Sequence, residues 1–130
     1  MLSEEYTNLA QEVIEEHEDL QWLLSGAVTI GYMSSDKKKK SQGFDIFGEC
    51  KKVTYPYTEI CPFDFLIILY DQNLQGLSYE QMKILMYHEL LHIGIDERSG
   101  EPKYVIVPHD VQDFRAVIEK YGIDWARKEE

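Results

Sequence analysis

The chain has 130 residues, of which 44% are hydrophobic, and this is the size and composition of one domain with its own core. Its 24 acidic and 13 basic residues give a formal net charge of −11. This charge argues against general affinity for nucleic acid, because phosphate binding needs clustered lysine and arginine. We expect a single domain over residues 1–130, with residues 124–130 as a frayed tail.

The chain begins with an amphipathic segment. Residues 3–24 carry apolar side chains at helical spacing, so we expect one helix there, ended by Gly26. His17 lies near the apolar side, where a packed histidine is commoner than a metal ligand. The acidic start Leu2-Ser3-Glu4-Glu5 lacks the basic region of a signal peptide, which predicts a cytoplasmic protein.

Three strands are expected next. Residues 27–33 and 44–55 are predicted to form a hairpin across the lysine run at 37–40, which we interpret as a solvated loop tip. Residues 63–70 are continuously apolar at their centre, which indicates a strand buried on both faces. The longest apolar run, 65–69, is too short to cross a bilayer, so we expect no membrane association. These elements predict an α+β fold with a small sheet of about three strands.

Two cysteines, Cys50 and Cys61, lie in this part of the chain, with ten residues between them. Neither belongs to a C-x-x-C pair, so they do not form half of a zinc knuckle. We expect reduced thiols in the cytoplasm, although the sequence alone leaves a disulfide open.

An H-E-x-x-H motif, His88 to His92, is the most informative pattern in the chain. Ser78 and Gln81 form a capping-box pattern before it and Gly94 suits a left-handed C-cap after it, so we expect one helix to carry the whole motif. Two histidines four residues apart share a helix face and can bind one metal ion. Glu89 lies beside them and is expected to activate a zinc-bound water. The predicted buried face of this helix consists of Met82, Leu85, Met86 and Leu90.

A hydrolytic zinc keeps three protein ligands and one open position, so a third ligand is expected downstream. His109 is the best candidate because it lies between a β-rich run at 104–107 and a second helical pattern. Asp96, Glu97 and Asp110 compete with it, and Asp110 also suits a helix N-cap.

The expected chemistry is hydrolysis of a peptide bond. Glu89 would accept a proton from the attacking water and pass it to the leaving amine. The developing oxyanion needs a further partner, and Tyr87, Arg98 and Tyr104 are candidates among which the sequence does not choose.

The second half of the chain resembles a known family. Residues Tyr87-His88-Glu89-Leu90-Leu91-His92-Ile93-Gly94, then Pro108-His109-Asp110-Val111-Gln112-Asp113-Phe114 and Tyr121-Gly122, are similar to the putative phage metallopeptidase domain family. More distantly they are similar to SprT-like and other zincin proteases. In the first half the likeness is weaker and runs through residues 48–53 and 63–70.

This resemblance implies a minimal zincin-like fold, with the sheet packed against an N-terminal helix, the HExxH helix and a C-terminal helix. It implies one Zn²⁺ per chain held by His88, His92 and His109, with Glu89 as the catalytic residue and a protein or peptide as the substrate. By analogy with zincins, a sheet edge from residues 63–70 or from the preceding hairpin would hold an extended peptide.

Two other classes of function stay open on the sequence. One is a metal-binding interaction module without turnover. The other is a zinc-dependent nuclease or other hydrolase, against which the acidic charge counts. For a phage-encoded protein, the expected location is the host cytoplasm.

Overall fold

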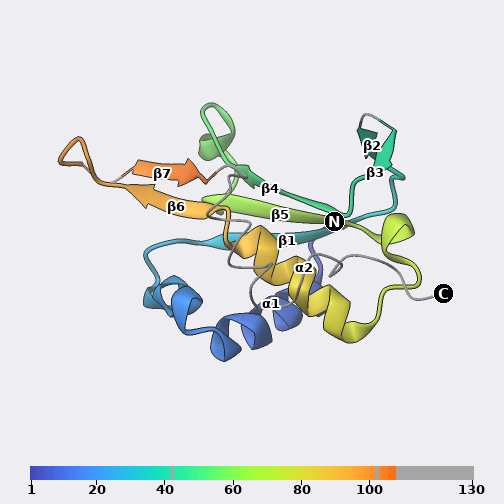
Figure 1. Ribbon diagram of the computed structural model, residues 1–130. Helices are drawn as coiled ribbons and strands as arrows, with labels where there is room; N and C mark the ends of the chain where they lie inside the picture. Colours follow the sequence, from blue (N-terminus) through green and yellow to red (C-terminus); the bar gives the residue numbers. More distant parts are fainter. Residues whose placement is uncertain (42, 102, 108–130) are drawn as a thin grey trace.

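The computed structural model describes residues 1–41, 43–101 and 103–107. The expected C-terminal helix, the tail at 124–130, His109 and Asp110 lie outside these residues. The described part of the chain is α+β, with helices packed on one face of a three-stranded sheet (Figure 1). The α-helices are α1 (Glu4–Glu16) and α2 (Tyr79–Leu90). The strands are β1 (Ile30–Ser35), β2 (Lys40–Ser41), β3 (Phe44–Asp45), β4 (Gly48–Lys52), β5 (Phe65–Tyr70), β6 (Ile93–Asp96) and β7 (Lys103–Ile106). Three 3-10 helices, η1 (Glu18–Ser25), η2 (Tyr57–Glu59) and η3 (Asp71–Leu74), complete these elements.

The N-terminal segment is two helices, not the single helix expected. α1 ends at Glu16, His17 is extended, and η1 follows before the left-handed Gly26 ends the region. The acidic residues around the break explain it. Negative side chains are unfavourable at the C-terminus of a helix and favourable in its first turn, where Glu18 and Asp19 begin η1.

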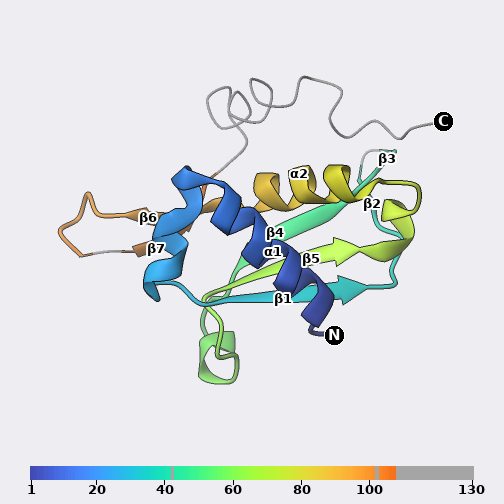
Figure 2. The same cartoon turned by 90° about the horizontal axis from the view of Figure 1, so that it is seen from below.

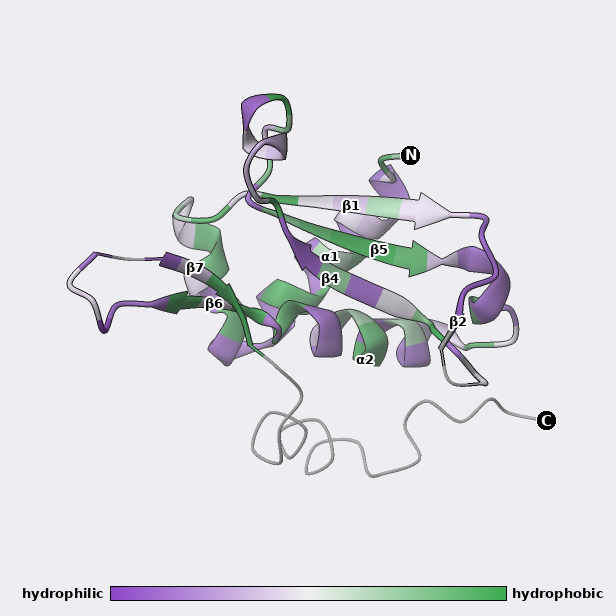
Figure 3. Cartoon of the chain, turned by 90° about the horizontal axis from the view of Figure 1, so that it is seen from above, coloured by the Kyte–Doolittle hydropathy of each residue, from purple (hydrophilic) through white to green (hydrophobic). Residues whose placement is uncertain are grey.

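The main sheet has the order β1-β5-β4, so the predicted hairpin between its first and last strands is wrong. β5 lies between them, parallel to β1 and antiparallel to β4. Phe65, Ile67 and Leu69 are fully buried toward the helices, and the most apolar strand therefore takes the central position. Leu66 and Ile68 are only half-buried on the opposite face, which no helix of the described residues covers (Figure 3). The prediction that this strand is buried on both faces is therefore only partly confirmed.

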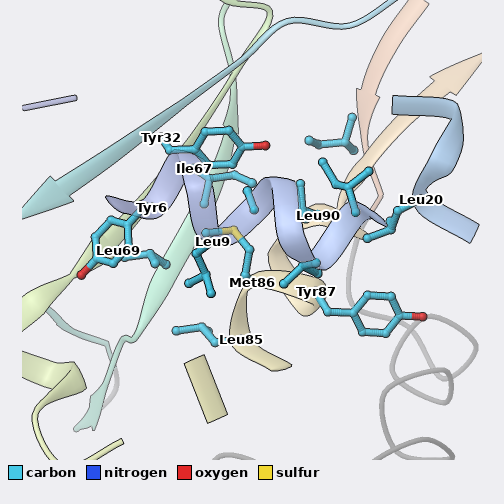
Figure 4. Close-up of a cluster of buried hydrophobic side chains, with 14 of the residues drawn as sticks. Tyr6, Leu9, Leu20, Tyr32, Ile67, Leu69, Leu85, Met86, Tyr87 and Leu90 are labelled. Atoms are coloured by element: carbon cyan, nitrogen blue, oxygen red, sulfur yellow. The ribbon is translucent and has the colours of Figure 1, made fainter. Parts of the chain in front are cut away.

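The core lies between this sheet and the two α-helices. Leu9 and Val13 of α1 are buried at helical spacing, and Met86 of α2 is fully buried close to Ile67 and Leu69 of β5 (Figure 4). Three of the four side chains predicted for the buried face of α2 are buried, and the fourth, Met82, is half-buried against the same cluster. The core therefore fixes α2 against the sheet.

β6 and β7 form an antiparallel hairpin that projects from the end of α2 (Figure 1). The strand expected at 104–107 is confirmed as β7, whereas β6 was not predicted. Gly94 lies inside β6 and is not a helix cap. A Cβ atom there would lie 2.7 Å from Cγ2 of Val107, so this glycine permits close packing within the hairpin.

Other expectations are tested by smaller features. Cys50 and Cys61 are both free thiols. Within the lysine run, Lys37 and Lys38 are exposed, while Lys39 pairs with Glu49. Among the helices of the described residues, none has the length and apolar character needed to cross a membrane.

Candidate metal centre

The N-terminus of α2 carries the predicted capping box. The Ser78 hydroxyl accepts a hydrogen bond from the Gln81 backbone N–H, and the Gln81 side chain accepts one from the Ser78 N–H. These bonds satisfy two N–H groups that would otherwise lack partners, so the start of the helix is well defined.

At the other end, α2 stops within the H-E-x-x-H motif. His88 and Glu89 occupy its last turn, and His92 lies two residues past its end. The backbone N–H of His92 bonds to the carbonyl of Glu89, so the turn tightens but continues the helical path. The expectation that one helix carries the whole motif is corrected to this extent, and both imidazoles still lie near each other.

The two histidines are held in a defined arrangement. The ring centroids of His88 and His92 are 5.1 Å apart, with the rings at 88° to one another. Nδ1 of His92 lies 2.5 Å from the carbonyl oxygen of Val107, and the Val107 N–H donates back to the carbonyl of His92. Because Nδ1 donates to that carbonyl, Nε2 carries the lone pair that a metal needs. Zn²⁺ prefers such neutral imidazoles oriented by a carbonyl, so the pair suits it.

Glu89 is a buried carboxyl group beside this pair. It is 4% exposed, and its Oε1 lies 4.0 Å from Nε2 of His92. Burial raises the pKa of Glu89 to about 8, and the negative charge of Glu49 adds to this effect. Groups with such shifted pKa values concentrate at functional sites.

Glu49 keeps its own charge through hydrogen bonds. Burial acts to raise its pKa, but bonds from Lys39 (2.6 Å) and from the Tyr70 hydroxyl (2.7 Å) outweigh it, so the pKa is lowered. Two carboxyl groups with different environments therefore lie at one site, with only Glu89 poised to gain a proton near neutral pH.

A cleft of about 460 Å³ opens in front of Glu89 and His92. Its other walls come from the edge strand β4 and from Ile106 of β7. α2 lies alongside β4 (Figure 2). A Cβ atom on Gly48 would lie 3.4 Å from Oε2 of Glu89, so the strand approaches the carboxylate closely. Neither Gly48 nor Val107 was predicted to contribute to the site, although a glycine inside a strand indicates close approach.

The competing third ligands within the described residues are engaged elsewhere. The Arg98 side chain donates to both carboxylate oxygens of Asp96, and Glu97 lies in the exposed turn of the hairpin. Across residues 1–41, 43–101 and 103–107, no three His, Cys, Asp or Glu side chains come together in a way that could hold a metal ion.

The three candidate oxyanion partners also have structural contacts. The Tyr87 hydroxyl donates to Asp19, and the Tyr104 hydroxyl donates to the carbonyl of Ala27. Arg98 is paired with Asp96. None of the three candidates is among the residues that line the cleft.

A family model described as "Putative phage metallopeptidase" matches residues 1–129. The chain belongs to this family. The match confirms the resemblance stated above and extends it over almost the whole chain. A metallopeptidase family implies a metal cofactor and a protein or peptide substrate. Neither a curated protein nor a solved structure matches the chain.

Proposed function

We propose that the chain is a zinc-dependent, zincin-like peptidase in which His88, His92 and His109 hold one metal ion and Glu89 is the catalytic base. The observation that carries this proposal is the arrangement at the cleft. The carbonyl of Val107 orients His92, whose Nε2 faces the buried carboxyl of Glu89.

Chain connectivity supports His109 as the third ligand. Val107 is hydrogen-bonded to His92 through both its N–H and its carbonyl group. His109 is only two residues after Val107 in the sequence. His109 therefore closely follows the point at which the chain is hydrogen-bonded to His92. Asp96 lies at the far end of β6 instead.

In the proposed hydrolysis, the metal ion and Glu89 have separate roles. Zn²⁺ bound there supplies a Lewis acid that polarises a carbonyl group and lowers the pKa of water. Glu89 accepts the proton of the attacking water and delivers it to the leaving nitrogen. Burial raises the pKa of Glu89 to about 8 in the metal-free chain, and the positive charge of a bound Zn²⁺ would lower it and favour the carboxylate that acts as the base.

The edge strand β4 offers the backbone groups that an extended substrate needs. The Val53 N–H bonds to Asp64 and the Phe47 carbonyl accepts from Tyr70, so these odd-numbered positions face β5. Antiparallel pairing alternates, and Gly48 and Cys50 therefore direct their backbone groups to the open edge. Of the two alternatives considered from the sequence, β5 is central and excluded. The strands of the predicted hairpin, β1 and β4, are both edge strands, and of these β4 lines the cleft and is proposed to bind the peptide.

Metal analysis tests the ligand set. Purified wild-type protein is expected to bind one zinc per chain, and His88→Ala and His109→Ala are each expected to lose it. Asp110→Ala is the matched control, because Asp110 is a neighbouring candidate. Zinc loss in Asp110→Ala with retention in His109→Ala would transfer the third position to the aspartate.

Catalysis is tested by Glu89→Gln, which keeps the shape of the side chain but removes the base. We expect kcat for an unstructured protein substrate to fall by about 10³-fold at unchanged zinc content. Glu80→Gln, on the exposed first turn of the same helix, is the control and should keep full activity. A wild type that binds zinc and cleaves no protein would instead indicate an interaction module, and cleavage of nucleic acid at matched zinc would indicate a nuclease.

A further inference from the structure

The segment between β4 and β5 carries a concentration of exposed apolar side chains. Tyr55, Tyr57 and Ile60 are 78%, 64% and 83% exposed. The segment projects beyond the end of the sheet in both views (Figures 1 and 2). Single exposed apolar residues are common on protein surfaces, whereas several grouped on one projecting segment indicate a binding surface.

A groove of about 370 Å³ lies beside this segment, and we refer to it as the apolar groove. Tyr57, Ile60 and Cys61 of the segment line it together with Leu66 of β5. Leu66 belongs to the sheet face that is left uncovered by the helices of residues 1–107 described in the structure (Figure 3). The groove is therefore large enough, and apolar enough, to bury one large side chain of a partner.

The apolar groove continues from the catalytic cleft along β4. Lys51 lines both of them. Gly48, at the start of β4, approaches Glu89, and Lys52, at its end, lines the groove. Strands rise about 3.3 Å per residue, so the two sites are about 13 Å apart, or four residues of an extended peptide.

The basic residues at the groove indicate the charge of its partner. Lys51 and Lys52 are both exposed, in a chain whose net charge is −11. The ammonium group of Lys51 lies 3.7 Å from Oε2 of Glu49, a partly exposed contact that contributes little. Both lysines can therefore pair with acidic groups on a bound peptide.

We propose that the apolar groove is a substrate subsite. It binds an aromatic or large aliphatic side chain of an extended polypeptide about four residues from the scissile bond, and Lys51 or Lys52 pairs with an acidic neighbour of that side chain. This proposal rests on the peptidase function proposed above. It narrows the substrate class to unstructured segments that combine an apolar residue with flanking acids.

Binding without turnover tests the subsite directly. Zinc-loaded Glu89→Gln protein is titrated with fluorescent unstructured peptides of about twelve residues, long enough to span both sites. They differ only in a central Asp-Phe-Asp, Asp-Ser-Asp or Lys-Phe-Lys. We expect the Asp-Phe-Asp peptide to bind about tenfold more tightly than either of the others.

Substitutions at the groove test whether it causes the difference in binding among the three peptides. In the same protein, Ile60→Ser is expected to remove the preference for phenylalanine, and its exposed position makes a folding defect unexpected. Lys51→Ser with Lys52→Ser is expected to remove the preference for acids. Leu24→Ser, at an exposed apolar position in η1, is the control that should change neither.

Cleavage of the same peptides by zinc-loaded wild-type protein separates the two proposals. Cleavage with equal binding of the three peptides, or an equal loss of preference in Leu24→Ser, would overturn the subsite alone. Discrimination without any cleavage would overturn the peptidase function, and with it the assignment of the groove to a substrate.

Discussion

Two buried histidines lie near the C-terminal end of α2, His17 against Tyr87 and His92 two residues past the helix. His17 and His92 are 3% and 8% exposed, and in each case Nδ1 lies close to a backbone carbonyl, that of Val13 or of Val107. The His17 ring stacks on Tyr87 at 4.1 Å, among the helices. His92 lines the cleft instead, with Nε2 directed at Glu89.

Burial and a contact between Nδ1 and a backbone carbonyl therefore do not by themselves identify a histidine as a metal ligand. Both histidines have these properties, as many structural histidines do. What distinguishes His92 is its place in the wall of the cleft, beside the carboxyl group of Glu89. The expectation from the sequence that His17 is a packed residue is confirmed by its contacts.

The largest effect that separates the two histidines is expected from His92→Ala. Loss of this side chain removes one of the proposed ligands, and zinc affinity should fall by more than about 100-fold, since even an outer partner of a ligand contributes 10- to 100-fold. Competition with a chromophoric chelator measures the affinity. Retained affinity would show that His92, like His17, is only structural.

His17→Ala should have the opposite profile. It removes the stacking on Tyr87 and the bond to Val13, and we expect a loss of about 2 kcal/mol in the free energy of unfolding. Zinc affinity of the folded protein should be unchanged. Urea denaturation measures the free energy of unfolding, and chelator competition measures the zinc affinity. A drop in zinc affinity without a loss of stability would indicate that His17, like His92, contributes to metal binding.

Gly94→Ala tests whether the hairpin holds His92 in place. The new Cβ would lie 2.7 Å from Cγ2 of Val107, so the hairpin must shift at a cost of about 1–3 kcal/mol. We expect zinc affinity to fall by about tenfold, as for loss of an outer partner of a ligand. Gly100→Ala, in the hairpin turn with no atom near the added Cβ, shows the cost of strain at a positive φ without this contact. Equal affinities in both variants would contradict the role of the hairpin.

The smallest effect is expected from Tyr87→Phe. The change removes the hydrogen bond to Asp19, worth about 1 kcal/mol of stability, and leaves the stacking on His17. Peptidase activity should persist, because Tyr87 faces the helices and not the cleft. A fall in kcat of about 100-fold or more would restore Tyr87 as an oxyanion partner.

Much of the local structure could be predicted from the sequence because local rules decide it. The capping box at Ser78 and Gln81 defines the start of α2, and a continuous apolar run defines β5. Strand order could not be predicted in this way, since the interposition of β5 between β1 and β4 depends on burying the most apolar strand, a property of the whole sheet. The break at His17 was missed because apolar spacing continues through it while the acidic residues do not suit one long helix.

The candidate site also combines features that local sequence rules predict with features that they do not. The pairing of His88 with His92 and the position of Glu89 follow from helical spacing. The structure places the two imidazole rings side by side, and Glu89 and His92 line the cleft. The anchor on Val107 comes from a backbone carbonyl fifteen residues away, which side-chain patterns do not reveal. Gly94 illustrates the difficulty, because a glycine after a helix suits a cap as well as a crowded strand.

The paired hydrogen bonds between His92 and Val107 have a thermodynamic consequence. They close the base of the β6–β7 hairpin on the residue proposed to bind the metal, so ordering of the hairpin and metal affinity are linked functions. The free-energy cost of ordering the hairpin is subtracted from the free energy of metal binding at the proposed site. Metal binding must therefore protect the Val107 amide from hydrogen exchange by the same amount of free energy. The stability of the β6–β7 hairpin would thereby help to determine how much metal the proposed site retains when zinc is scarce.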